Sequence, residues 1–436
     1  MHPVSERLRD ARERSGLSQA DLARAAMMHP SYVSHLERGI RGPGPAALER
    51  LASALGITTT YLEQGDRSPA YQASEAAVVR ARQLVRSGRP GAAAAELAAV
   101  DLDALDVDQA GRVLLAHADA LDRVGELEEA CRLLADATQR FADGHRPVRA
   151  AQAATRLVMA LTEAGELTAA VQAGEHHLAA LTEGADGSDA LFRLESTLVW
   201  AYVARGDNTY ALVRGKDLLA RALQNGSARA VSSVHWNLAF VEDAYGHGDE
   251  ALAHLRAALA VSGNDEADSD VPLLRLDLAQ LLLEVTPPRP KEALAELDAA
   301  RLALEIGESQ VDLARAATFR SRAQLLLGQT RAALTYGLKA VELIGPGERR
   351  DGAAAHEALG DALLASGERV AALKAYREAA SRLESMPPGR PAAAAWRRLA
   401  DRLRVAGDGM DAVVETYGRA LAALGARTTL RLPVAR

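Results

Sequence analysis

Apolar residues recur along this chain at the three- and four-residue spacing of amphipathic helices, and glycine interrupts them at regular places. In the first 64 residues this pattern predicts five short helices: Val4–Arg14, one that begins after Ser18, Pro30–Arg38, Ala46–Leu55 and Thr59–Leu62. Each break coincides with a glycine, a proline or a capping serine, which are residues that end or begin helices. Residues 1–65 are therefore predicted to form one small all-helical domain.

From about residue 71 onward, a longer pattern repeats. A helical run ends in glycine, and alanine follows five residues after that glycine. The pairs are Gly88/Ala93, Gly125/Ala130, Gly165/Ala170, Gly206/Ala211, Gly246/Ala251, Gly328/Ala333, Gly367/Ala372 and Gly407/Ala412, with Pro288/Ala293 in the one vacant place. Successive intervals are 37 to 42 residues, so the sequence predicts nine helical hairpins in one array.

Such a hairpin has a simple physical basis. Glycine ends the first helix in a left-handed conformation, and alanine lets the second helix approach closely. An acid often follows the glycine, where its charge favours the next helix N-terminus; these acids are Glu126, Glu166, Asp207, Glu368 and Asp408. One hairpin cannot bury its apolar face alone, so neighbours must stack into a solenoid, expected to be right-handed.

The predicted fold is all-α. It comprises the helical domain at residues 1–65, a linker at 66–72, the repeat array at 73–427 and a tail at 428–436. Hydrophobic residues make up 48% of the chain but aromatic residues only 4%, a balance that suits closely packed helices.

The cysteine content and the lack of long apolar segments indicate in which cellular compartment the protein is expected. A single cysteine, Cys131, excludes an internal disulfide framework, and structural burial is its expected role. The N-terminus lacks the apolar core of a signal peptide, and no segment approaches the roughly 20 apolar residues of a membrane span. We expect a soluble, cytoplasmic protein with no membrane partner.

No pattern of catalytic or metal-binding residues stands out. There is no phosphate-binding loop, no HExxH and no paired cysteine, and His176 and His177 are adjacent and so point to different helix faces. The acidic segment 264–270 is interpreted as a solvated loop between repeats. No cofactor, metal site, catalytic residue or enzymatic activity is therefore expected.

The net charge of -7 argues at first sight against a nucleic-acid partner. Residues 1–64, however, contain eight arginines and seven acids, a balance of +1 that leaves -8 on the remainder. Any DNA contact must come from locally placed arginines and helix N-termini, without a broad basic field.

Residues 1–64 resemble the lambda-repressor-like, or XRE-family, helix-turn-helix domain. The match is carried by GLSQADLA at 16–23, YVSHLERG at 32–39 and LERLASALG at 48–56. The resemblance implies that the third helix enters the DNA major groove with its N-terminal end toward the bases. It also implies an ion pair between Arg12 and Glu37 that ties this helix to the first helix.

By the same resemblance, Pro30, Ser31 and His35 occupy base-reading positions, and Tyr32 and Ser34 flank them. Gln19 stands where the family anchors a phosphate, and Arg38 and Arg41 are expected to contact further phosphates. None of the base-reading residues is Arg, Asn or Gln, the types that bind a base edge through two hydrogen bonds. We therefore expect DNA shape or water to carry part of the recognition.

The repeats resemble tetratricopeptide repeats through GELEEA at 125–130, GERVAA at 367–372 and Trp396 at the first-helix tryptophan position. Their period of about 40 residues is longer than the usual 34 or so, and HEAT-like helix pairs are the alternative.

In tetratricopeptide hairpins the first helix lines an inner groove. Counting back from each turn, this resemblance implies groove positions at Arg156, Arg193, Thr197, Trp200, Trp236, Asn237, Phe240, Asp243, Arg275, Arg315, Phe319 and Arg322. There the arginines could hold carboxylates, and Asn237 could bond a peptide backbone. The alternative is that the aromatic residues belong to the hairpin core and the arginines are simply solvated.

A helix-turn-helix joined to such an array is similar to the bacterial peptide-sensing quorum regulators. The resemblance implies a homodimer on double-stranded operator DNA, with a peptide or small-molecule effector in the groove that modulates DNA binding. The alternative function is a tetratricopeptide interaction scaffold with a vestigial or protein-binding helix-turn-helix.

Overall fold

The computed structural model describes residues 4–64, 69–185, 188–262, 270–307, 309–345 and 350–426, and every regular element among them is a helix. Residues 66–68 of the predicted linker, the acidic segment 264–269 and the tail 428–436 lie outside these residues. None of the described helices is both long enough and apolar enough to cross a bilayer.

The N-terminal domain contains α1 (Val4–Arg14), α2 (Gln19–Ala25), α3 (Pro30–Glu37), α4 (Pro45–Leu55) and α5 (Thr59–Gln64). These five helices confirm the predicted elements, with boundary differences of one or two residues. The side chains of Ser18 and Asp21 form a capping box at the start of α2. The apolar faces meet in one core, which includes Leu8, Leu22, Val33, Leu36, Leu51 and Leu55.

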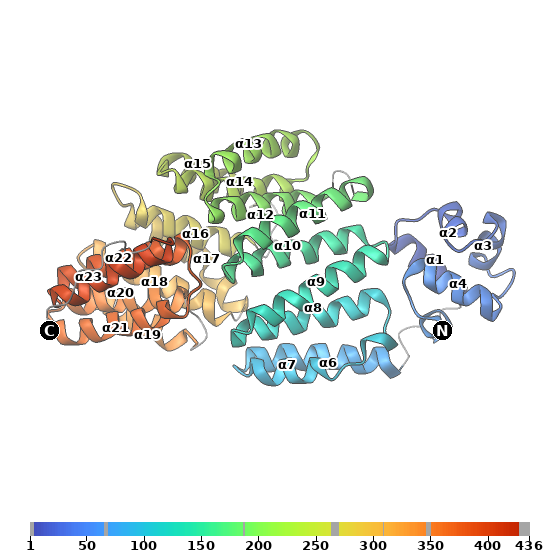
Figure 1. Ribbon diagram of the computed structural model, residues 1–436, viewed down its shortest axis with the longest axis horizontal. Helices are drawn as coiled ribbons and strands as arrows, with labels where there is room; N and C mark the ends of the chain where they lie inside the picture. Colours follow the sequence, from blue (N-terminus) through green and yellow to red (C-terminus); the bar gives the residue numbers. More distant parts are fainter. Residues whose placement is uncertain are drawn as a thin grey trace. The chain divides into compact units, whose positions relative to one another are not determined.

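Nine helix pairs follow among the described residues, as the nine registered turns predicted (Figure 1). Their bounds are α6 (Pro69–Arg86) and α7 (Pro90–Ala98), α8 (Val107–Val124) and α9 (Leu127–Asp143), α10 (Pro147–Glu163) and α11 (Leu167–Ala185), α12 (Asp189–Arg205) and α13 (Asn208–Asn225), α14 (Ala228–Ala244) and α15 (Gly248–Ser262), α16 (Val271–Glu284) and α17 (Pro290–Gly307), α18 (Gln310–Leu326) and α19 (Thr330–Leu343), α20 (Arg350–Ala365) and α21 (Arg369–Glu384), and α22 (Arg390–Ala406) and α23 (Met410–Ala423). A short 3-10 helix, η2 (Leu102–Ala104), lies between α7 and α8.

The turns within the pairs have the predicted backbone. All eight turn glycines adopt the left-handed conformation, with φ between 72° and 104°. The acids after them act more weakly than a cap would: Glu126, Asp207 and Glu368 occupy N-cap positions, but their side chains make no capping hydrogen bond. Their contribution is the favourable placement of negative charge near a helix N-terminus.

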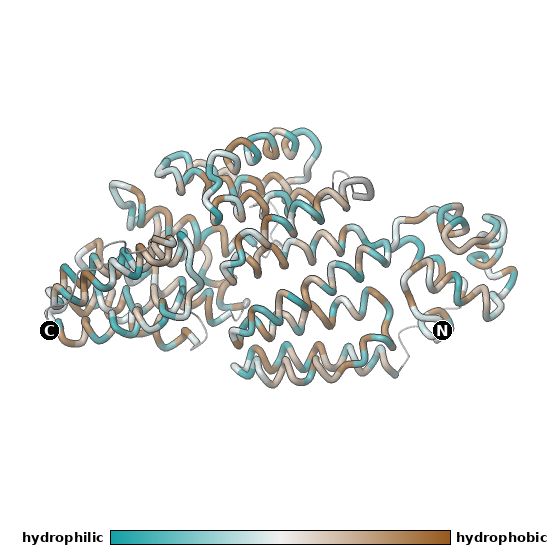
Figure 2. The backbone as a smooth tube through the Cα atoms, in the orientation of Figure 1, coloured by the Kyte–Doolittle hydropathy of each residue, from teal (hydrophilic) through white to brown (hydrophobic). Residues whose placement is uncertain are grey.

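Packing between pairs explains the alanine five residues after each turn. This alanine is almost completely buried in eight of the nine described pairs, and Ala412 of α23 is half-buried. Hydrophobic and hydrophilic positions alternate along the helices (Figure 2), as stacking of amphipathic helices requires. One continuous core extends from α14 to α18 and includes Leu255, Leu278, Leu297 and Phe319.

The helices fall into two compact units, residues 1–160 with 172–194 and residues 161–171 with 195–436. The first unit contains the N-terminal domain together with the first helix pairs. Helix α6 begins at Pro69, inside the segment predicted as a linker, so few residues separate the two predicted domains.

A buried arginine joins the N-terminal domain to the repeats within the first unit. Arg146, immediately before α10, donates one hydrogen bond to the Leu55 carbonyl at the end of α4 (2.6 Å) and another to Ser15 Oγ after α1 (2.7 Å). Its Nε bonds Asp108 in the first turn of α8 at 3.2 Å. Arg146 therefore satisfies polar groups on both sides of this junction.

Gly56 allows the end of α4 to approach Val107 and Gly144 closely at the same junction. It ends α4 with φ of 62°, and its carbonyl accepts the Val107 N–H at 2.9 Å. A Cβ at Gly56 would lie 3.0 Å from Val107 Cγ2 and 3.3 Å from Gly144 Cα, so a larger residue would push the two sides apart. The contact of Gly56 with Val107 and Gly144 was not predicted, because no local sequence pattern indicates it.

We expect Arg146→Ala to loosen this junction, because it leaves the Leu55 carbonyl without its donor and Asp108 without its cation. The cost should be about 2–4 kcal/mol of unfolding free energy. Urea unfolding should show the loss, and amide hydrogen exchange should rise at the end of α4 and the start of α8. Arg149→Ala, which removes an exposed arginine on α10, serves as the control and should change neither. Equal exchange in both variants would contradict the role of Arg146.

Candidate functional site

A buried carboxylate fixes α3 against α1 and α2. Glu37, the last residue of α3, is only 2% exposed. Arg12 of α1 donates Nε to Glu37 Oε1 at 2.6 Å and Nη2 to Oε2 at 3.0 Å, so the ion pair implied by the family resemblance is present. Gln19 of α2 donates its Nε2 to the same carboxylate at 2.8 Å. Hydrogen bonding to Glu37 raises the pKa of Arg12, as expected for a guanidinium held beside an anion.

The opposite side of α3 is open to solvent. Pro30, Ser31 and His35 are exposed there, while Tyr32 and Ser34 are half-buried. The exposed residues occupy the first turns of α3, the part that would approach base edges. The structure therefore places the predicted base-reading residues on one accessible surface.

His29 is part of this surface although the sequence analysis did not single it out. It is the N-cap of α3, and its Nδ1 accepts the Ser31 N–H at 3.3 Å. The same ring nitrogen lies 2.7 Å from Ser31 Oγ. A polar residue immediately before a proline at the first helical position was the available signal. His29 thus fixes the position of the Ser31 side chain in the absence of DNA.

Two arginines extend the surface beyond α3. The guanidinium carbon of Arg41 lies 5.6 Å from the centre of the Tyr32 ring, and Arg38 Nε donates to the Ser34 carbonyl at 3.1 Å. Both side chains are exposed. Gln19 differs from the other predicted DNA-binding residues, because its Nε2 already donates a hydrogen bond to Glu37.

In the second unit, polar side chains link the first helices of successive pairs. Asp277 of α16 accepts Trp236 Nε1 of α14 at 2.8 Å and Arg315 Nη2 of α18 at 2.7 Å. Glu284 of α16 bonds Arg322 of α18 at 3.3 Å. The partners are 38 to 41 residues apart, which is close to the repeat period.

The same linkage continues between α20 and α22. Arg402 Nε lies 2.9 and 3.0 Å from the two carboxylate oxygens of Asp361, and Arg402 Nη1 lies 3.2 Å from Glu357. We call these bonds, together with the Asp277 and Glu284 bonds, the first-helix ladder. Asp277 and Glu284 were missed from sequence, although an acid one repeat before an arginine was a usable signal.

Most of the predicted groove arginines have ion-pair partners within the chain. Arg315 and Arg322 are paired within the first-helix ladder, Arg156 pairs with Asp119, and Arg275 pairs with Glu296 of its own helix pair. Carboxylates of the chain already neutralise these four guanidinium groups, so none of the four needs a ligand carboxylate as its partner. Arg193 is exposed on α12.

The groove residues at the centre of the prediction are also partly used inside the chain. Asn237 Nδ2 donates to Ser196 Oγ at 2.7 Å and to the Ser233 carbonyl at 3.1 Å. Thr197 and Phe319 are buried, because they face the helix packing of the second unit. Both findings favour the alternative in which these side chains hold the repeats together.

Besides Arg193, three other predicted groove residues remain accessible. Trp200 is half-buried, Phe240 is 36% exposed and Asp243 is exposed. Burial among the surrounding helices raises the pKa of the Asp243 carboxyl, and the nearby charge of Glu284 raises it further.

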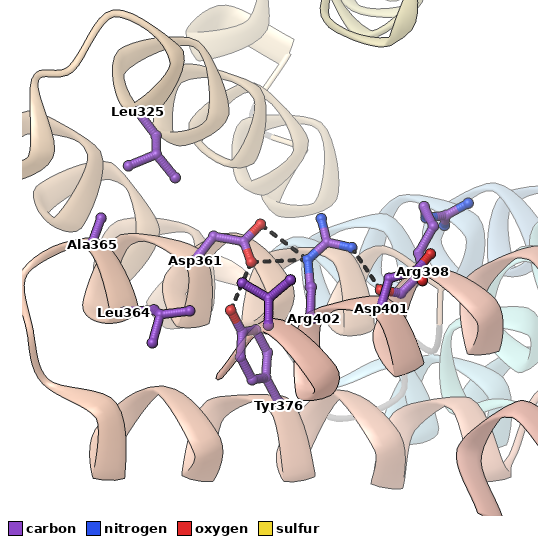
Figure 3. Close-up of a pocket in the computed structure, with 9 residues that line it drawn as sticks. Leu325, Asp361, Leu364, Ala365, Tyr376, Arg398, Asp401 and Arg402 are labelled. Atoms are coloured by element: carbon purple, nitrogen blue, oxygen red, sulfur yellow. Dashed lines mark hydrogen bonds and ion pairs between the residues drawn. The ribbon is translucent and has the colours of Figure 1, made fainter. Parts of the chain in front are cut away.

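A cavity of about 440 Å³ lies in the second unit between α18, α20, α21 and α22 (Figure 3). It is lined by Leu325, Asp361, Leu364, Ala365, Tyr376, Arg398, Asp401, Arg402 and Val405. Tyr376 is buried, and its hydroxyl donates to Asp361 Oδ1 at 2.8 Å. Burial raises the pKa of Tyr376, and the Asp361 carboxylate adds to the effect.

Comparison with known proteins agrees with the geometry of the first five helices. Residues 8–62 match the family described as Helix-turn-helix. The N-terminal domain is a helix-turn-helix domain. The HTH-type transcriptional regulator DdrOP3 of Deinococcus deserti is 45% identical over 62 residues, which are 14% of this chain and 48% of that protein. The chain thus spans about half the length of this curated relative, and the likeness is confined to the helix-turn-helix domain.

Two solved structures align with a larger part of the chain, both at TM-scores below 0.5. PlcR of Bacillus thuringiensis, solved with the peptide PapR7 and DNA, is 13% identical, with a TM-score of 0.35 and coverage of 71% of this chain and 96% of that one. A Rap protein solved with Competence and Sporulation Factor is 12% identical, with a TM-score of 0.49 and coverage of 95% and 99%.

We expect Glu37→Ala to destabilise the helix-turn-helix domain, because it leaves Arg12 without its buried partner and Gln19 without its acceptor. The cost should be on the order of 3 kcal/mol. Hydrogen exchange in α2 and α3 measures it. Glu13→Ala is the matched control, since Glu13 also contacts Arg12 but is exposed. If both variants exchanged alike, Glu37 would not be what holds α3.

Proposed function

We propose that this chain is a sequence-specific DNA-binding transcription regulator whose repeat array binds a peptide or other small effector. The helix-turn-helix match over residues 8–62, with α3 locked by Glu37 and its opposite face open, is the observation that carries the proposal. A rigidly held helix with an exposed N-terminal half is what insertion into a major groove requires.

The roles of individual residues follow from their chemistry. Ser31 and His35 offer hydrogen bonds to base edges, and Pro30 offers apolar contact with a thymine methyl. In this proposal Arg38 and Arg41, which are both exposed, neutralise phosphates on either side of α3. Since one such domain covers only a half-site, the proposed regulator binds its operator as a homodimer.

The effector part of the proposal rests on the repeat array. Stacked helix pairs present extended surfaces for ligands, and Trp200, Phe240 and Asp243 keep such a surface accessible here. The Arg146 junction supplies a physical link, because any change in the packing of α8 and α10 acts directly on the ends of α1 and α4.

The second candidate is an interaction scaffold whose helix-turn-helix binds protein or nothing. The weak base-reading chemistry of Pro30, Ser31 and His35 favours it, whereas the locked and exposed α3 favours DNA. Direct DNA binding separates the two.

We expect the full chain to bind genomic fragments, including its own upstream DNA, with an affinity that falls as salt rises. Arg38→Ala should reduce the slope of log affinity against log salt by about 0.9, the value for one phosphate contact. His35→Ala should weaken binding to the preferred fragment by about fivefold and non-specific binding less. Electrophoretic shift across a salt series measures both effects.

Arg89→Ala is the control for this series, because Arg89 is exposed in the repeat region, outside the helix-turn-helix domain. It should bind DNA like the unmodified chain. Absence of any salt-dependent DNA binding would overturn the regulator and leave the scaffold.

A further inference from the structure

Arg398 of α22 lines the cavity beside the first-helix ladder. It lies nine residues before the turn glycine Gly407, the position that Arg156 and Asn237 occupy in their own repeats. Those two bond to the preceding first helix, through Asp119 and Ser196 respectively. Among the residues that the structure describes, the Arg398 guanidinium has neither a hydrogen bond nor an ion pair.

The acids around the cavity do not supply that partner. Asp361 accepts from Arg402 and from Tyr376, as the dashed lines in Figure 3 show. Glu357 is buried and pairs with Arg402 at 3.2 Å. The carboxylate of Asp401 accepts the Tyr417 hydroxyl at 2.5 Å. The cavity is therefore left with an unused cation rather than an unused anion.

The surroundings of Arg398 make an anion favourable there. Its side chain reaches solvent, but the walls of the cleft reduce its hydration, and this burial lowers the pKa of Arg398. The negative charges of Glu357 and Glu284 partly offset this effect, and the neighbouring positive charge of Arg402 adds to it. A carboxylate would relieve both costs, and a guanidinium binds a carboxylate through two parallel hydrogen bonds.

The rest of the lining specifies what the anion is attached to. Leu325, Leu364 and Val405 give the cavity an aliphatic side, and about 440 Å³ is within the size range of small-ligand sites. Asp401 lies three residues after Arg398, on the same face of α22, so one of its oxygens can accept an N–H from a group held by Arg398. A carboxylate, an aliphatic group and an N–H together describe the last residue of a peptide.

We propose that this cavity binds the C-terminal residue of a short peptide, with Arg398 holding the free carboxylate and Leu325, Leu364 and Val405 enclosing an aliphatic side chain. The inference rests on the proposed effector role of the repeat array. It specifies that the array recognises the C-terminal end of a peptide effector.

The test uses the full chain and a pool of random hexapeptides that end in leucine, prepared once with a free carboxylate and once as the C-terminal amide. Peptides retained after equilibrium dialysis are identified and quantified by mass spectrometry. We expect retention of the acid pool, at least tenfold weaker retention of the amide pool, and at least tenfold weaker retention of the acid pool by Arg398→Ala.

Arg397→Ala is the matched control, because Arg397 is an adjacent exposed arginine that does not line the cavity. It should retain the acid pool like the unmodified chain. Both variants should unfold at the same temperature and bind DNA alike, since neither residue belongs to the helix-turn-helix domain.

Each other result has a definite meaning. If neither amidation of the peptides nor Arg398→Ala changed peptide retention, the cavity assignment would be overturned. The effector function would then lie elsewhere on the array. Retention of free leucine as strongly as the peptides would overturn the peptide assignment. No retention of either pool would overturn the inference together with the peptide part of the proposed function, while the DNA experiment would still decide the regulator.

Discussion

The repeat region depends on stacking, because a single helix pair leaves apolar surface that only its neighbours can cover. The left-handed glycine turns set each pair, and the buried alanines five residues later let the next helices approach. The core that extends without interruption from α14 to α18 shows the consequence. Stability is therefore a property of adjacent pairs, and a change in one pair is transmitted to the next through packed side chains.

Stacking also decides the fate of charged groups on the first helices. Once these helices are neighbours, an acid and an arginine about one repeat apart come within hydrogen-bond distance, as Asp277 and Arg315 do. Burial makes such pairing necessary, since an unpaired charge between helices is costly. The ladder thus uses most of the polar groups that would otherwise face a ligand, and it makes the unpaired Arg398 informative.

The helix-turn-helix domain follows the same rule at smaller scale. Its one buried carboxylate, Glu37, is satisfied by a cation from α1 and an amide from α2, so α3 has a fixed orientation. Arg146 extends this principle across the junction with the repeats, where one guanidinium bonds α4, α8 and the residue after α1. The helix-turn-helix domain and the repeats are joined in this way through buried polar contacts.

The sequence alone determined the helices, their turns and the domain order, because helix periodicity, capping residues and left-handed glycines act over a few neighbouring residues. It also identified the exposed face of α3 through a strong local motif. Only the tertiary structure decided the long-range charge pairs, because Arg315 and Asp277, Arg402 and Asp361, and Arg146 and Asp108 are each 38 or more residues apart in sequence. For the same reason Thr197 and Phe319, expected in an open groove, are buried: whether a helix face is open depends on the neighbour that stacks against it.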